Sequence, residues 1–300
     1  MVRLVFISIL FCCVLAGRAQ DSSLLSMLGD SSAPGKKLLV TQTFKAKRIV
    51  NTQTVEAPAK GDLNFIIMHR FGEINDGSYE FFGLDNATMR IGLDYGLTEK
   101  LAIGIGRSSE EKTFDGYLKY KLLRQSTGQG AVPLSVSLLA SITNYTLKFD
   151  NKPYLNAKYR TSYMVQALVA RKITTALSLQ VAPTWQHFNL VPTVRDKNDV
   201  FSTSIGGRLK FTKRMSITAE YNILFPDQVT SIDVKNSLSM GFDIETGGHV
   251  FQLVFTNSQG MTESQFIPRT TGSWGKGDIY FGFNISRNFS LGKKEKDKKW

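Results

Sequence analysis

Three histidines are the side chains of this sequence that most readily suggest acid–base catalysis or metal binding: His69, His187 and His249. A lipase-like site would need a serine beside a histidine at a membrane face. Only His187 offers a suitable position, and no serine stands out near it on the same face of its segment. The stretch GIGRSS at 104–109 has some glycines of a dinucleotide loop, but it ends an extended segment and begins no helix. We therefore expect interfacial or solvated histidines, no catalytic residue, no metal and no cofactor, with a membrane hydrolase as the third-ranked alternative.

A second set of reactive side chains consists of charged residues that alternate with apolar ones along extended segments. Its members are Arg70, Arg90, Asp94, Asp115, Lys119, Lys121, Arg208, Lys210, Glu220, Asp243 and Glu245. Six positive and five negative charges on one face suit the wall of an aqueous lumen with little preference between anions and cations. The alternative is that Arg208 and Glu220 pair across neighbouring strands.

The segments that position these charges have a period of two. In MRIGLDYGLTEKLAIGIG at 89–106, apolar residues alternate with small or charged ones on both sides of a short polar turn, which predicts a β-hairpin. The same test predicts twelve strands, at 62–71, 88–96, 100–108, 113–124, 132–143, 162–172, 176–188, 200–211, 215–224, 237–246, 249–257 and 278–291. Most are about as long as a tilted strand needs to be to cross a bilayer.

The links between these strands alternate between long and short, apart from the short link at 109–112. Bacterial outer-membrane barrels have long loops at one end and short turns at the other. A soluble barrel would place the apolar faces inside, where twelve strands would leave a wide apolar hole. We therefore predict an all-β fold, a transmembrane antiparallel β-barrel of about 12 strands at 62–291, whose apolar faces meet lipid and whose lumen is polar.

The ends of the chain differ from the barrel. Residues 1–19 have the short basic start, apolar run and small-residue site of a cleaved signal peptide. Both cysteines, Cys12 and Cys13, lie in that peptide. Residues 20–61 are predicted to form a periplasmic or luminal segment, because Lys45, Lys47 and Arg48 are unsuited to lipid. Residues 292–300 form a basic tail.

The net charge of +12 is spread over turns and the tail, without the compact basic patch that nucleic-acid binding requires. We therefore expect no nucleic-acid partner.

Several segments resemble a family of uncharacterised outer-membrane β-barrels found in Bacteroidota. They are TFKAKRIVNTQTVE (43–56), GDLNFIIMHRFG (61–72), FGLDNATMRIGLDYGLTEKLAIGIG (82–106), FTNSQGMTESQFI (255–267) and GDIYFGFNISRNF (277–289). The resemblance implies the fold and a location in the outer membrane of a Gram-negative bacterium, and it assigns no activity.

The first functional hypothesis is a pore or transporter for small solutes, whose lumen residues 20–61 or the 258–277 loop could close. The second is a structural or partner-docking barrel. The expected partners are membrane lipid, the barrel-assembly machinery and small solutes.

Overall fold

The structure is a computed structural model that describes residues 37–291. The predicted signal peptide at 1–19, residues 20–36 and the basic tail at 292–300 lie outside the described residues. Within residues 37–291, no helix has the length and apolar character needed to cross a membrane.

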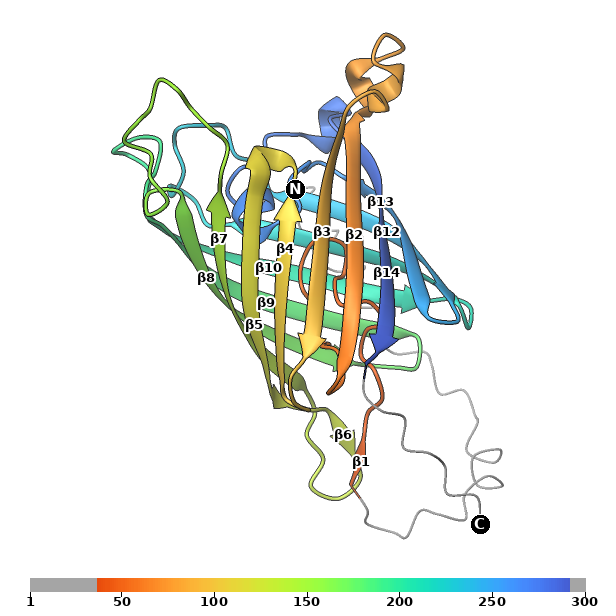
Figure 1. Ribbon diagram of the computed structural model, residues 1–300. Coiled ribbons are helices and arrows are strands. Elements are labelled where there is room, and N and C mark those ends of the chain that lie inside the picture. The colour runs from red at the N-terminus through yellow and green to blue at the C-terminus, as the bar shows by residue number, and fades with distance from the viewer. Residues whose placement is uncertain (1–36, 292–300) are drawn as a thin grey trace, which may run out of the picture.

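Twelve antiparallel strands form one closed barrel, which confirms the predicted fold class (Figure 1). The strands are β2 (Asp62–Glu73), β3 (Ala87–Gly96), β4 (Leu101–Ser108), β5 (Thr113–Leu123), β7 (Ser135–Tyr145), β8 (Thr161–Lys172), β9 (Leu177–Phe188), β10 (Asp199–Lys210), β11 (Met215–Leu224), β12 (Ser237–Thr246), β13 (His249–Thr256) and β14 (Tyr280–Ser290). Each pairs with its neighbour along the chain, and β14 pairs with β2 to close the ring. Closure leaves no strand edge without a partner, as a barrel in lipid requires.

The two ends of the barrel differ in the length of their links. At the end we call the loop end lie η1 (Ile74–Asp76), η2 (Phe81–Gly83), η3 (Glu110–Lys112), α3 (Glu263–Phe266) and η4 (Trp274–Lys276). At the opposite end, the turn end, most links are tight turns, and the short strands β1 (Leu38–Leu39) and β6 (Ser126–Thr127) pair with each other. Both ends of the described chain lie at the turn end (Figure 1).

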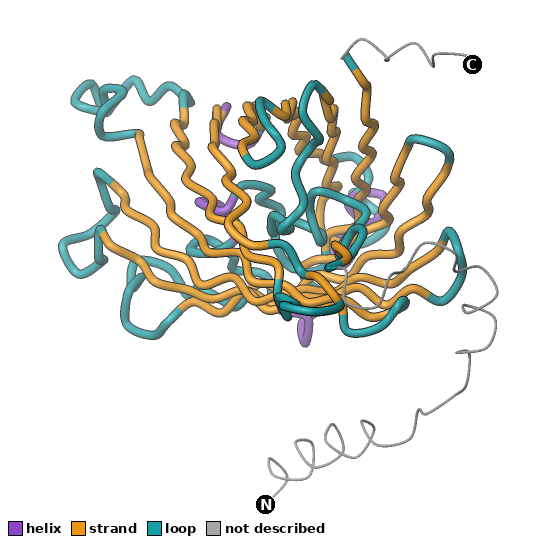
Figure 2. The backbone as a smooth tube through the Cα atoms, turned by 90° about the horizontal axis from the view of Figure 1, so that it is seen from below, coloured by secondary structure: helices purple, strands orange, loops and turns teal. Residues whose placement is uncertain are grey.

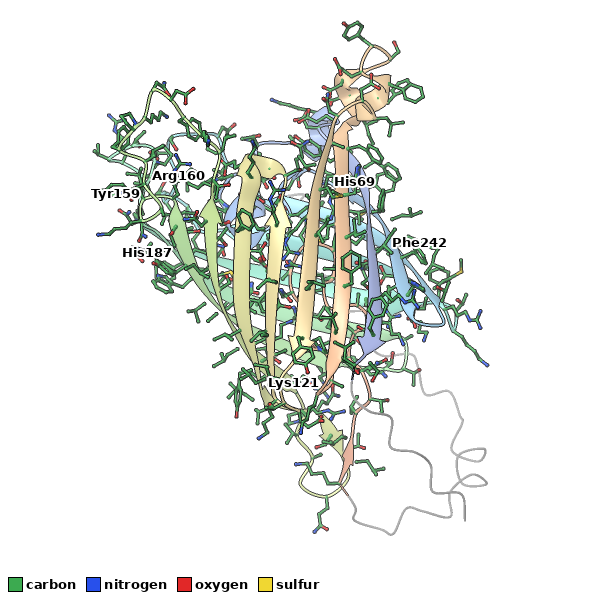
Figure 3. All side chains as sticks on the ribbon, in the orientation of Figure 1. His69, Lys121, Tyr159, Arg160, His187 and Phe242 are labelled. Carbon is green, nitrogen blue, oxygen red and sulfur yellow. The ribbon has the colours of Figure 1, made fainter. Side chains whose placement is uncertain are left out.

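Alternation along the strands separates an apolar outer face from a largely polar inner one. In β11, Ile217 and Tyr221 are exposed on the outside, while Thr218, Glu220 and Asn222 are buried. Phe242 of β12 likewise points away from the barrel (Figure 3). The apolar face of the 89–106 hairpin is also outward, since Ile91, Leu93 and Ile105 are exposed.

Strand β8 departs from this pattern, because its inward side chains include Met164, Leu168 and Ala170, all buried. These residues belong to an apolar cluster with Phe44 and Val50 of the N-terminal segment. The interior is therefore filled by protein along this wall. Ile66 and Met68 of β2 are also buried inside and cluster with Met261, so the expectation of a polar lumen holds only for part of the interior.

Candidate functional site

The barrel interior holds a segment of the chain's own N-terminal region, residues 43–58, which we call the plug. Nearly all of its residues are buried. Loop segments inside the ring of strands are visible in Figure 2. The plug folds back on itself. Arg48 and Gln53 form an isolated antiparallel β-bridge through their backbones, and the Ile49 amide donates to the Thr52 carbonyl at 2.9 Å. Its tip, residues 49–52, reaches the centre of the network described next.

Glu220 of β11 holds the tip of the plug. Its carboxylate accepts the backbone N–H groups of Val50, Asn51 and Thr52 at 3.1, 2.9 and 3.0 Å. Successive backbone N–H groups that converge on one anion form a concave binding site for negative charge. Glu220 is 1% exposed, so these contacts replace the water that a free carboxylate would bind.

Lys119 of β5 binds residues 53–56 of the plug, which we call its descending arm, from the side of the barrel away from Glu220. Its ammonium donates to Gln53 Oε1 at 2.7 Å and to the carbonyls of Thr54 and Glu56 at 3.0 Å each. Gln180 of β9 accepts from the Val55 amide at 2.9 Å and donates to the Gln53 carbonyl at 2.7 Å. The three N–H donors of the Lys119 ammonium are thus all used in hydrogen bonds to the plug.

Three further inward side chains bind the tip. Arg70 donates to Asn51 Oδ1 at 2.8 Å, Gln252 to the Ile49 carbonyl at 2.8 Å and Asn284 to the Val50 carbonyl at 2.9 Å. The plug backbone therefore finds in the barrel wall the partners that a buried backbone requires.

Arg90 and Asp115 form a buried ion pair beside the plug. Arg90 donates from Nε to Oδ1 at 2.9 Å and from Nη2 to Oδ2 at 2.5 Å. The guanidinium lies against Gly106, where a Cβ atom would collide with it. Asp94 is also buried, at 5% exposure.

The alternative of an Arg208–Glu220 pair is wrong. Arg208 donates to Glu245 and lies 4.0 Å from Asp243, because Glu220 faces Gly206 in the strand register and is bound to the plug instead. Asp243 also accepts from Gln252 at 2.9 Å. Lys121 and Lys210 are half-buried close to the turn end, where Figure 3 shows Lys121.

All eleven of the charged residues singled out in the sequence are buried or half-buried on inward positions of their strands. The structure brings most of them to the plug or into ion pairs.

A second segment, residues 257–268, folds into the loop end of the barrel, and we call it the inward loop. Thr262 and Gln265 cap its short helix α3 through a capping box. Glu263 forms a buried ion pair with Arg48 of the plug at 3.2 Å, and its carbonyl accepts from Gln186 at 2.9 Å. The plug and the inward loop are therefore joined to each other inside the barrel.

The exit of the plug is fixed where it leaves the barrel at the turn end. Lys60 forms an isolated parallel β-bridge with Gly96, the last residue of β3, through the backbone. The Gly61 amide donates to the Gly96 carbonyl at 2.9 Å. A Cβ atom on Gly96 would collide with the Ala59 carbonyl, so the close approach requires glycine.

A cavity of about 520 Å³ opens at the loop end. We call it the vestibule; its walls come from the links at 146–160, 189–198 and 225–236, from the inward loop and from the adjoining strand ends.

The histidines lie among aromatic side chains on the outer face. His69 stacks on Phe283 with ring centroids 4.9 Å apart. His187 contacts Asp199 Oδ1 at 2.9 Å, and Trp185 donates to the same oxygen at 3.0 Å. Figure 3 labels His69 and His187. Among residues 37–291, no group of three or more His, Cys, Asp or Glu side chains is arranged to hold a metal ion.

Sequence reasoning did not identify the neutral partners of the plug, namely Gln180, Gln252 and Asn284, or the ion pair of Arg48 with Glu263. Their inward parity was readable from alternation, but nothing in their spacing indicates which plug atom each one binds. The vestibule likewise has no sequence signal, because it is assembled from separate loops.

The model of one protein family, described as a membrane bound beta barrel domain (DUF5777), matches residues 44–289 of the chain. This range includes nearly all of the plug as well as of the barrel. No curated protein matches the chain in sequence.

Among solved structures, the chain is similar to the NanC porin, with 8% identity and a TM-score of 0.45 over 76% of this chain and 98% of that one. It is also similar to an outer membrane channel from Pseudomonas putida F1, with 11% identity and a TM-score of 0.46 over 78% and 97% of the two chains.

Proposed function

The chain belongs to this family of membrane-bound β-barrel domains, and from that premise we propose that it is a gated channel for small solutes, closed by its own plug. We place it in the outer membrane of a Gram-negative bacterium of the Bacteroidota. The loop end would face the outside and the turn end the periplasm, as in other outer-membrane barrels. Lipid and the barrel-assembly machinery are the partners that this location implies.

The observation that carries the proposal is the way in which the plug is held. Its tip and descending arm are bound by hydrogen bonds between wall side chains and plug backbone groups: Glu220 accepts from amides, and Lys119 donates to carbonyls. Water can replace such partners, so each neutral hydrogen bond contributes only about 0.5–1.5 kcal/mol net, and each one to a charged group about 1.5–3 kcal/mol. The plug is therefore attached by contacts that can be exchanged while the closed strand ladder stays intact.

The apolar part of the interface favours the closed state at rest. Phe44, Ile49, Val50 and Val55 of the plug pack against the wall in one buried cluster. Withdrawal exposes these side chains to water, which costs about 1.5–3 kcal/mol for each large one. We therefore expect a channel that is closed most of the time and conducts only when the plug is displaced.

Conductance in planar bilayers tests the proposal. We expect rare, short openings for the wild type, and large steady currents when residues 43–58 are replaced by a glycine–serine linker of equal length. A shift in gel mobility between unboiled and boiled samples shows that the variant has formed a barrel. A folded linker variant that conducts no better than an empty bilayer would overturn the proposal.

A cross-link separates gating from permanent closure. Asn51 Nδ2 lies 3.3 Å from Ser239 Oγ, and no cysteine remains in the chain after residue 19. In the variant Asn51→Cys with Ser239→Cys, a short thiol-to-thiol cross-linker should abolish the wild-type openings. The control is the same variant before cross-linking.

The second candidate is a structural barrel whose plug never leaves. The observation that favours it is the buried Arg48–Glu263 pair, which joins the plug to the inward loop and so opposes withdrawal of the plug. A wild type that never opens under applied voltage, together with a conducting linker variant, would favour this second function over a gated channel.

A further inference from the structure

We propose that the vestibule at the loop end is a binding site for small organic anions that carry an apolar ring or chain. The proposal names the solute class for the channel and to that extent rests on the proposed function. Binding in the vestibule does not require the plug to move, so the two can be tested separately.

The vestibule is a built cavity with a buried floor. Its volume of about 520 Å³ falls in the range of pockets that enclose small organic ligands. Thr113 and Val200, which lie on strands, and Leu155 of the 146–160 link are buried at 9% exposure or less and line it. Arg269, Pro268 and Ser264 complete the wall on the side of the inward loop.

Aromatic and aliphatic side chains line most of the vestibule. They are Tyr145, Phe149, Tyr154, Tyr159, Phe188, Leu190, Val191 and Ile232. Tyr154 and Tyr159 remain exposed at 59% and 40%, although both carry rings that bury well against an apolar surface. Such a lining favours a ligand with an apolar body.

The charges around the vestibule favour an anion. Four cations line it, Lys152, Arg160, Lys197 and Arg269, against two acids, Glu111 and Asp196, which leaves an excess of two positive charges. Both acids already have partners. Glu111 binds Arg269 at 2.6 Å.

Asp196 is used to fix the loops. One oxygen accepts from the Thr230 and Ser231 amides at 2.6 and 3.0 Å, and the other accepts from the Thr193 amide at 3.1 Å. Burial raises the pKa of Asp196, but these hydrogen bonds outweigh it and hold the pKa well below its usual range. The carboxylate is therefore ionised and fixed to its own loops, and its charge is already counted in the net excess of two positive charges.

Arg160 combines the positive charge and the aromatic lining of the vestibule. Its Nε donates to the Leu155 carbonyl at 2.8 Å and its Nη1 donates to the Leu147 carbonyl. The guanidinium lies over Tyr145 and Phe149, 5.5 and 6.0 Å from the ring centroids. Figure 3 shows Arg160 and Tyr159 in this region. A fixed guanidinium on aromatic rings presents both an anion-binding group and an apolar surface to one ligand.

Lys152 and Lys197 are the cations best suited to a test. Lys152 lies 5.3 Å from the ring centroid of Phe149, and neither side chain forms a hydrogen bond or ion pair among the contacts described for residues 37–291. Their replacement therefore removes charge from the vestibule without breaking a loop contact of the kind that Arg160 makes. Lys148 is a matched control, because it lies in the same link, is exposed and does not line the cavity.

Calorimetric titration of the folded full-length protein in a non-ionic detergent tests the proposal, with 2-naphthoate as the probe and 2-naphthamide as its neutral isostere. We expect saturable binding of 2-naphthoate and at least about tenfold weaker binding of 2-naphthamide. The double variant Lys152→Gln with Lys197→Gln should weaken naphthoate binding by about fivefold or more. Lys148→Gln should leave it unchanged. Titration into protein-free micelles gives the background.

Three results would overturn the proposal: naphthoate uptake no greater than that of the micelles, equal affinity for the acid and the amide, or equal loss in the Lys148→Gln control. A gel-mobility shift on boiling shows that each variant is folded. Naphthoate binding by a protein whose plug never opens would support the site while contradicting the channel.

Discussion

At the scale of single residues, most of the interior charges have protein partners in place of water. Glu220 and Lys119 bind the plug backbone, and Arg90 binds Asp115. Alternation alone places these side chains inside the barrel. It does not reveal their partners. A charged side chain that faces water and one that faces a buried peptide occupy the same alternating positions of a strand. An even balance of charges is thus compatible with a filled lumen as well as with a conducting one.

The Arg90–Asp115 pair provides a test of this view. Asp115→Asn leaves a buried guanidinium without its counter-charge, since Arg90 is 1% exposed. We expect the variant to lose about 3–5 kcal/mol of unfolding free energy. Urea-driven unfolding from lipid vesicles measures the loss.

The matched control replaces both partners, as Arg90→Met with Asp115→Leu. Because an apolar pair leaves no buried charge, it should recover most of the stability. A double variant as unstable as Asp115→Asn would show that the pair is not the cause.

At the scale of elements, η3 joins β4 to β5 and supports the inward loop. The Glu110 carbonyl accepts from Gln265 at 3.4 Å, and Glu111 pairs with Arg269. Burial, with Glu111 adding to it and Arg269 opposing it, raises the pKa of Glu110 to about 7. The Glu110 Oε2 atom has no hydrogen-bond partner within the described part of the chain.

A pH dependence follows from that pKa. Between pH 4.5, the ordinary value, and pH 7, the folded chain keeps a proton on Glu110 that the unfolded chain has released. The free energy of unfolding therefore falls as the pH rises through this window. Glu110→Gln should be more stable than the wild type by about 1–3 kcal/mol at pH 8 and equal to it at pH 4.

The comparison uses urea unfolding at both pH values. Glu99→Gln, an exposed acid at the turn end, is the control and should not change the pH profile. Equal stability of Glu110→Gln and wild type at pH 8 would contradict the assignment.

Elements differ in how far the sequence determines them. The strands were predictable to within three residues at each end, because a period of two is imposed by the pleat and by one buried face. The plug was predictable only as a segment too polar for lipid. Its position depends on hydrogen bonds between residues far apart in the chain, such as Asn284 with Val50, and such contacts leave no periodic signal. The apolar inner residues of β8 likewise make sense only once the plug is in place.

At the scale of the whole molecule, the barrel presents an apolar outer surface of limited height. Ile91 lies in the middle of β3 and Leu97 just beyond its end, and both are similarly exposed, at 41% and 40%. Ile91→Arg should cost about 2–4 kcal/mol of folding free energy in vesicles, and Leu97→Arg about 0–1 kcal/mol, because the cost of a charge falls from the bilayer midplane towards the interface. Equal costs would mean that the bilayer does not cover β3 as proposed.

The attachment of the plug also determines how the molecule responds to mechanical force. The entry of the plug is held by the β1–β6 pair and its exit by the Lys60–Gly96 bridge, both at the turn end. We expect tension applied at Lys37 to separate that pair first and then to break the plug contacts one after another towards Asn51. Such peeling needs less force than shearing all contacts at once. When fully extended, at about 3.3–3.6 Å per residue, residues 43–58 are longer than the hydrocarbon core is thick, at about 30 Å. Pulling on residue 37 from the turn end can thus withdraw the plug from the barrel, while the inward loop stays at the loop end.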